Sequence, residues 1–187
     1  MKFLKWILLL LLFIDWGHTY LQCYERMMVD GDMIALILPA QPLKKVLEDP
    51  LGLSVLLHDE VYNATNRYFS HVIMMHTFRN LPLFFQNFTD PIDSIYVSLA
   101  FASTMVQVVI IVLLAFYSVS TLNIINKKNN LRFTNLVIAM VLITPLFQFH
   151  GYNNYMGILN LSLTYTFSYA LPLIFILLYF LFFYTNL

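Results

Sequence analysis

The chain has 187 residues, of which 60% are hydrophobic and 11% charged, and its formal net charge is zero. Soluble domains carry roughly 45–50% apolar and about 25% charged residues, so this composition indicates a membrane protein. The balanced charge gives no basis for a nucleic-acid partner, and the single cysteine, Cys23, excludes an internal disulfide.

The amino-terminal segment predicts a first transmembrane helix over residues 3–20. Two lysines precede the apolar stretch Trp6–Ile14, which is also the layout of a secretory signal peptide. No cleavage site of the small-x-small kind follows, so we favour an uncleaved span over a removed signal. Asp15 and His18 would then lie near the far interface of the membrane.

Residues 21–92 form the one long segment outside the predicted spans. Five prolines divide it into short pieces that mix aromatic residues and methionines with scattered polar residues. Segments of this kind are typical of helices that lie in the membrane interface or against the spans. The expected short helices cover about Met33–Leu38, Leu43–Leu47, Leu53–Leu57 and Asn63–Arg79.

Two long stretches contain no Asp, Glu, Lys or Arg. The first separates Asp93 from Lys127, and the second runs from Phe133 to the last residue. Since a bilayer core of about 30 Å needs roughly 20 apolar residues in a helix, the first holds one span and the second holds two. The fold class is therefore all-α, a polytopic membrane protein with about four transmembrane helices. The last three spans are 94–117, 133–149 and 158–184, the final one long enough to tilt or to kink at Pro172.

Basic residues predict the orientation. The short connection 118–132 is basic and the polar turn 150–157 has no Lys or Arg, so the positive-inside rule places the former in the cytoplasm. Both termini are then cytoplasmic, and residues 21–92 are extracytoplasmic, in a bacterial inner membrane.

Two polar clusters in residues 21–92 are candidates for chemistry. Asp30 and Asp32 flank a glycine, and paired carboxylates bind a divalent cation or provide a general base; a solvated Asp-Gly turn is the alternative. His58, Asp59 and Glu60 offer an acid, a base or a metal ligand, although exposed acids after a short helix are common. The sequence does not identify a metal.

Arg67 and Arg79 lie near the predicted membrane surface. Either guanidinium could pair with the phosphate of a lipid-linked substrate, or anchor the chain to lipid headgroups. His71 and His76 are five residues apart, which turns them roughly 140° from each other on a helix and makes them poor ligands for one metal.

The predicted second span carries a stripe of small residues, Ser94, Ser98 and Ala102, which suits close helix packing. Asp15 is the one acid within a predicted span. Ion-coupled transport usually needs an ionisable group inside the membrane, so this pattern counts against a self-contained pump.

A short cytoplasmic amino terminus, a span, and an outer loop that opens with acids and continues as interfacial helices resemble the amino-terminal part of GT-C-type polytopic glycosyltransferases. That family uses polyprenyl-phosphate-linked sugar donors. The resemblance implies that Asp32 or Asp30 is the catalytic base or a metal ligand, with His58, Asp59 and Glu60 as an accessory cluster. Because GT-C enzymes have eight or more spans, it also implies that this chain is a truncated amino-terminal piece.

Two other functions remain open. In the first alternative the chain is a non-catalytic subunit whose spans pack with a partner membrane protein. In the weaker one it is a component of a transporter or channel. The expected partners are the lipid bilayer, a lipid-linked sugar in the enzyme case, and other membrane subunits in the alternative case.

Overall fold

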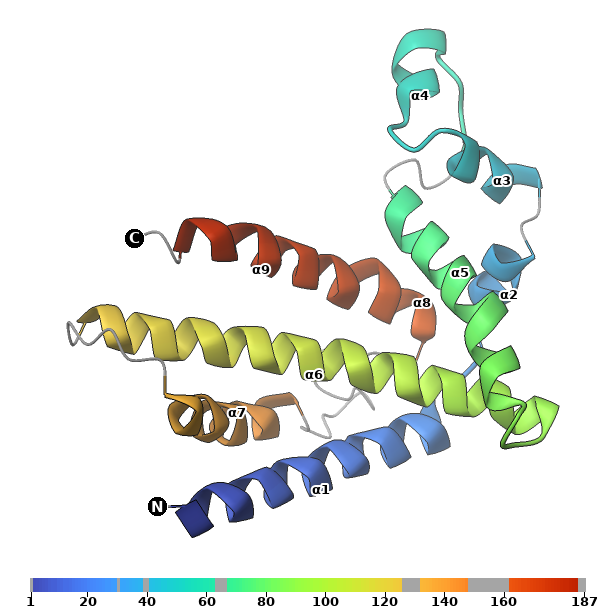
Figure 1. Cartoon of the computed structure of the whole chain (residues 1–187). Coiled ribbons are helices and arrows are strands. Elements are labelled where there is room, and N and C mark those ends of the chain that lie inside the picture. Colours follow the sequence, from blue (N-terminus) through green and yellow to red (C-terminus); the bar gives the residue numbers. More distant parts are fainter. Residues whose placement is uncertain are drawn as a thin grey trace.

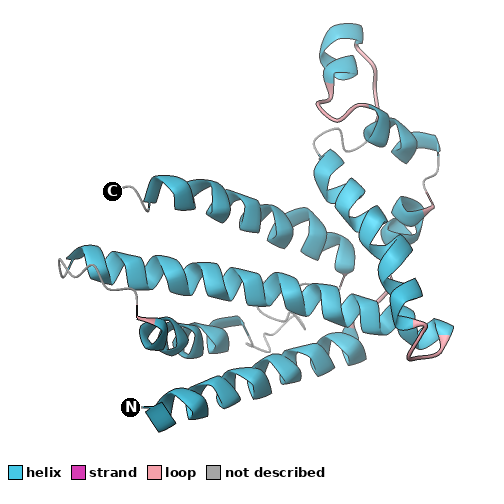
Figure 2. Cartoon of the chain, in the orientation of Figure 1, coloured by secondary structure: helices cyan, strands magenta, loops and turns pink. Residues whose placement is uncertain are grey.

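The computed structural model describes residues 2–29, 31–38, 41–62, 67–125, 132–147 and 162–184. These residues are nearly all helical and include no strand (Figure 2), which confirms the all-α class. Three helical stretches are long and apolar enough to cross a membrane, as expected of a membrane protein. They are α1 (Lys2–Arg26), α6 (Pro91–Ile125) and the continuous stretch Leu163–Tyr184.

Helix α6 lies at the centre of the molecule. In Figure 1, α9 (Leu171–Tyr184) lies on one side of α6, and α1 and α7 (Phe133–Phe147) lie on the other. Within the most apolar part of each stretch, 61% of the residues are buried in α6, against 11% in α1 and 22% in Leu163–Tyr184. The other helices are therefore arranged around α6.

The small residues of α6 explain how its neighbours can approach closely. Ser94 and Ser98 are fully buried and Ala102 is nearly so. The hydroxyl of Ser94 donates to the carbonyl of Pro91 at 2.7 Å, and that of Ser98 donates to the carbonyl of Ser94 at 2.6 Å. Because each hydroxyl is satisfied by α6 itself, this stripe packs like a set of small apolar residues.

The chain termini lie at one end of the helical bundle, here called the terminal end (Figure 1). At this end the Nζ atom of Lys5 lies 4.5 Å from the ring centre of Phe133, at the start of α7. The hydroxyl of Tyr184, at the end of α9, contacts the hydroxyl of Thr121 on α6. The terminal end thus holds a contact between α1 and α7 and a contact between α6 and α9.

The other end, here called the distal end, is marked by an isolated parallel bridge between Met28 and Ser162. It holds the helices α2 (Gly31–Ile37), α3 (Gln41–Glu48), α4 (Leu53–His58) and α5 (Tyr68–Phe85). These helices lie where short helices are predicted, although α5 begins later and ends later than expected. Figure 1 shows α5 crossing the end of α6, with α3 and α4 beyond it.

The last helical stretch contains a local widening. Helix α8 (Leu163–Tyr165) continues into a π-helical segment, Thr166–Ala170, and then into α9. Pro172 has no N–H and its ring would collide with the carbonyl of Ser168, four residues earlier. A π-helical turn just before the proline accommodates both effects.

Helix α7 is shorter than the predicted span 133–149. Its 15 residues extend about 22 Å, less than the bilayer core of about 30 Å. The polar turn 150–157 and the beginning of the predicted span 158–184 lie outside the described residues. A fourth crossing therefore stays a prediction.

We expect Ser98→Leu to destabilise the folded protein. Inserting a larger side chain at a fully buried position typically costs about 1–3 kcal/mol, because neighbouring helices must move apart. Unfolding in detergent with increasing dodecyl sulfate, followed by circular dichroism, measures the effect. Val109→Leu is the matched control, since Val109 is 39% exposed on the same helix; equal stability of the two variants would contradict the close packing of the stripe.

Candidate functional site

The acid pair predicted to be catalytic lies at the start of α2. Asp30 is outside the described residues, and Asp32 belongs to the first turn of α2, with a side chain that is likewise outside the described part. The backbone places Asp32 at the distal end of the bundle, shortly after α1. The other helices of residues 21–92, the segment to which the sequence analysis assigns the candidate site, lie at the same end.

The second predicted cluster closes α4. His58 is its last residue, and Asp59 adopts a left-handed conformation with φ of 51°, its N–H donating to the carbonyl of Ser54. The carboxylate of Glu60 binds Lys45 Nζ at 3.0 Å, and both side chains are about half exposed. Glu60 therefore joins α4 to α3, and exposed ion pairs of this kind contribute little stability.

Asp49 is a polar residue that the sequence analysis did not select. Its carboxylate accepts hydrogen bonds from the backbone N–H groups of Leu53 and Ser54, at 3.0 and 2.8 Å, and from the hydroxyl of Tyr62 at 2.5 Å. The position before Pro50 is a sequence signal for a turn. Asp49 thus satisfies the first N–H groups of α4 and holds the chain that follows it.

The same contacts shift two titrations. The Tyr62 hydrogen bond, with the bonds from the Ser54 and Leu53 N–H groups, holds the pKa of Asp49 below its usual value, although partial burial opposes this. The hydrogen bond to Asp49, together with partial burial and the negative charges of Asp49 and Glu60, raises the pKa of Tyr62 to about 12. The Asp49–Tyr62 hydrogen bond stabilises the arrangement of residues 41–62, here called the α3–α4 unit.

The two arginines have different settings. Arg79, on α5, donates from Nε and Nη2 to the carbonyl oxygen of Ile37, at 3.0 and 2.8 Å. Ile37 ends α2, so Arg79 satisfies a terminal carbonyl and binds α2 to α5. Arg67 directly precedes α5 and is half-buried. The structure thus gives Arg79 a structural contact.

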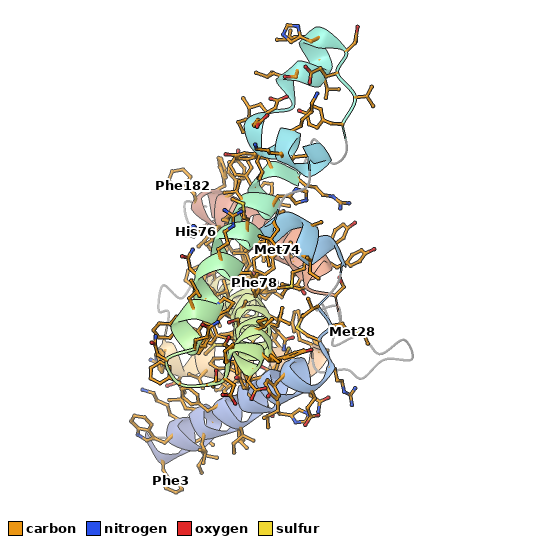
Figure 3. The ribbon with its side chains drawn as sticks, turned by 90° about the vertical axis from the view of Figure 1, so that its right-hand side faces the viewer. Phe3, Met28, Met74, His76, Phe78 and Phe182 are labelled. Atoms are coloured by element: carbon orange, nitrogen blue, oxygen red, sulfur yellow. The ribbon has the colours of Figure 1, made fainter. Side chains whose placement is uncertain are left out.

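Helix α5 separates its two histidines, as the sequence spacing indicates. His71 is buried, together with Met74 and Phe78, on the face toward the bundle, whereas His76 is exposed. Figure 3 looks onto the distal end and shows His76 and Phe78 on α5. The rings of Phe78 and Phe167 meet edge to face with centres 5.7 Å apart, which packs α5 against the π-helical segment.

The most buried polar contacts lie between α1 and α6. The Nε2 atom of Gln107 donates to the hydroxyl of Thr19 at 3.4 Å, and Cys23 faces Thr104 one turn away. All four side chains are at least nine-tenths buried. We call this set the polar seam. Its chemistry is that of helix association, because hydrogen bonds between spans hold them together.

In the described ranges, no three His, Cys, Asp or Glu side chains come together in a way that could hold a metal ion. The polar contacts of α2–α5 join one helix to another, and those of the polar seam join α1 to α6.

Comparison with known proteins gives no relative: no protein-family model, no curated protein and no solved structure matches the chain. The resemblance to GT-C-type glycosyltransferases stays a hypothesis drawn from the sequence.

We expect the Asp49–Tyr62 contact to stabilise the α3–α4 unit between about pH 4 and about pH 10. The lowered pKa of Asp49 gives stability that is present above its unfolded value, 3.8, and is lost as pH falls through the folded value. The raised pKa of Tyr62 gives stability that is present below 10.0 and is lost as pH rises through about 12.

The ultraviolet titration of tyrosinate, taken as the difference between the protein and its Tyr62→Phe variant, isolates this residue. Asp49→Asn should return the difference titration toward pH 10, because the carboxylate charge is gone. A Tyr62 that titrates near 10 in the unaltered protein would contradict the contact.

Proposed function

We propose that the chain crosses the inner membrane of a bacterial cell four times, with both termini in the cytoplasm and residues 21–92 outside. Helices α6 and α9 run in the same direction (Figure 1), so the chain between them returns across the bundle. Helix α7 begins that return at the terminal end. Lys2 and Lys5 lie at the start of α1, and the connection 118–132 between α6 and α7 is also basic. These two basic segments support a cytoplasmic placement of the terminal end.

Cysteine labelling tests this topology. In a Cys23→Ala background, Val61→Cys should react with an impermeant maleimide added to intact cells, because Val61 is 95% exposed beyond α4. Asn129→Cys, in the basic connection 118–132, should react after the membrane is permeabilised and not before. Labelling of Asn129→Cys from outside would overturn the orientation.

We further propose that the protein is a non-catalytic subunit that packs with a partner membrane protein. The observation that carries this proposal is the exposure of α9, which contacts the bundle along one stripe. Its other faces present large aromatic side chains, a residue type enriched at protein interfaces. The most exposed aromatic residues of α9 are Tyr179, Phe180, Phe182 and Phe183, each more than half exposed.

The contacts of two predicted transferase residues favour the subunit over the enzyme. Arg79 donates from Nε and Nη2 to the carbonyl of Ile37, and Glu60 of the predicted accessory cluster binds Lys45. Asp59 occupies a left-handed turn that ends α4. These groups serve the packing of α2–α5, which fits a docking surface better than a site of sugar transfer.

Photo-crosslinking in cells tests the partner. A benzophenone amino acid in place of Tyr179, which is 64% exposed, should give one discrete adduct with another membrane protein. The same substitution at Ile174, which is only 6% exposed and packs in a buried cluster with residues of α6, should give adducts within the chain. Adducts with lipid alone at Tyr179 would contradict the subunit proposal.

A further inference from the structure

We propose that α4 anchors the α3–α4 unit in the outer leaflet of the membrane, through three leucines that the protein itself leaves uncovered. These residues are Leu53, Leu56 and Leu57, here called the leucine stripe. The inference rests on the proposed crossing of the membrane. It concerns a different surface from the face of α9 and does not depend on a partner protein.

The first step is the pattern of α4, which is the reverse of the pattern of α3. In α3 the apolar Val46 is fully buried, and Lys44 and Glu48 are exposed. In α4 the polar Ser54 is half-buried, and no residue of this helix is fully buried. Helix α3 thus has the arrangement expected of a helix in water, whereas α4 turns its apolar side outward.

The three leucines lie on one side of α4. Leu56 and Leu57 follow Leu53 by three and four residues, so the three side chains fall within an arc of about 100° around the helix. Leu53 is 46% exposed, Leu56 76% and Leu57 71%. The chain therefore covers little of this apolar surface, and its contact with water is unfavourable.

The α3–α4 unit holds this surface in a fixed place. The carboxylate of Asp49 binds the N–H groups of Leu53 and Ser54 at the start of α4, and Lys45 binds Glu60 just after its end. Both ends of α4 are thus tied to α3 and to the turn that follows α3. Helix α3 in turn packs against α5, so the leucine stripe is presented by a braced element.

The second step is the level of the outer membrane surface. The helical rise from Lys5 to Met28 is about 35 Å, slightly more than the bilayer core of about 30 Å. In the proposed topology, the bridge between Met28 and Ser162 is therefore close to the outer edge of the hydrocarbon region.

Two tyrosines that follow Ser162 agree with this level. Tyr165 of α8 and Tyr169 of the π-helical segment are each more than half exposed, and their rings stack with centres 5.7 Å apart. Tyrosine is enriched at the membrane–water interface, because its ring is apolar and its hydroxyl reaches water. The start of the last helical stretch thus belongs to the outer interface.

Helix α4 lies at this level and is displaced to the side. In Figure 1 the bundle runs from left to right, and α4 lies above α8, clear of the bundle, with α3 further toward the distal side. Figure 3 looks onto the distal end and likewise shows the α3–α4 unit projecting away from the bundle. The space beside a transmembrane bundle at this level is occupied by lipid.

The third step identifies the occupant of the leucine stripe as lipid. The stripe carries no charge, and it lies where headgroups meet acyl chains. Amphipathic helices bind there with their apolar side buried about 5–10 Å, and the affinity follows the apolar area that is buried. His58, Asp59 and Glu60, which come directly after the stripe, are exposed. They can therefore stay at the headgroups and in water while the leucines enter the leaflet.

Lipid quenching tests the anchor with the full-length protein in phosphatidylcholine vesicles. In a Cys23→Ala background, a nitrobenzoxadiazole label on Leu57→Cys should be quenched by a phosphatidylcholine that carries a nitroxide near the top of its acyl chain. The same label on Val61→Cys should be quenched by aqueous iodide and not by the nitroxide lipid. Val61 is the matched control, because it belongs to the same unit and is more exposed than the stripe, but lies outside it. Equal lipid quenching at the two positions, or none at Leu57→Cys, would overturn the proposal.

Thiol reactivity gives a second readout that needs no apolar label. Leu57→Cys should react with an impermeant maleimide at least about tenfold more slowly than Val61→Cys, since apolar surroundings disfavour the reactive thiolate. Because Leu57 is exposed on the protein itself, this protection has to come from outside the chain. Protection without quenching by the nitroxide lipid would indicate a second copy of the protein and would overturn the lipid anchor.

A charge on the stripe should release α4 from the leaflet. With the label moved to Leu53→Cys, Leu57→Glu should abolish quenching by the nitroxide lipid. Val61→Glu adds the same charge outside the stripe and should leave the quenching in place. A Tyr62 that still titrates near pH 12 shows that the α3–α4 unit keeps its fold in each variant. Quenching that Leu57→Glu does not change would contradict the role of the stripe.

Photo-crosslinking in cells separates lipid from protein as the occupant. A benzophenone amino acid in place of Leu56 should give adducts with lipid, and a discrete adduct with another protein would overturn the proposal. Correct labelling of Val61→Cys and Asn129→Cys, together with a Leu57→Cys that reacts as fast as Val61→Cys, would sink the anchor and leave the topology standing.

Discussion

The hydrogen bond from Gln107 to Thr19 joins α1 to α6 through two buried, uncharged side chains. Between transmembrane helices the hydrophobic effect supplies little attraction, so close packing and such bonds hold the bundle together. The serine stripe of α6 adds close packing without unsatisfied hydroxyls. With α1 fixed in this way, α6 presents its remaining sides to α5, α7 and α9, and the fold is organised around this one helix.

Helices α2–α5 are connected to α6 one through another. Helix α5 packs on the distal end of α6, Arg79 binds the end of α2 to α5, and Lys45 and Asp49 organise the α3–α4 unit beyond. Each contact uses a polar side chain to satisfy a helix end or to hold a turn. Several polar side chains of this segment therefore serve to hold its short helices together.

The sequence predicted much of this fold because its signals are local. The stretch without charged residues before Lys127 marks α6, and Pro50 lies in the break between α3 and α4, whereas Pro82 lies inside α5 and does not end it. Helix α1 continues to Arg26, six residues past the predicted span 3–20, because packing against α6 supports a helix where the sequence offers only scattered polar residues. The Asp49–Tyr62 bond was missed because it joins residues far apart along the chain. Periodicity carries no information on such a contact.

The stretch without charged residues that begins at Phe133 has a consequence for biosynthesis. A helix normally receives its orientation from the basic residues that flank it, and α9 has none on its carboxyl side within the chain. Under the proposed topology, the basic connection 118–132 orients α6, and α6 then offers Tyr117 and Thr121 as docking points for α9. The direction of α9 would in that case follow from its packing on α6.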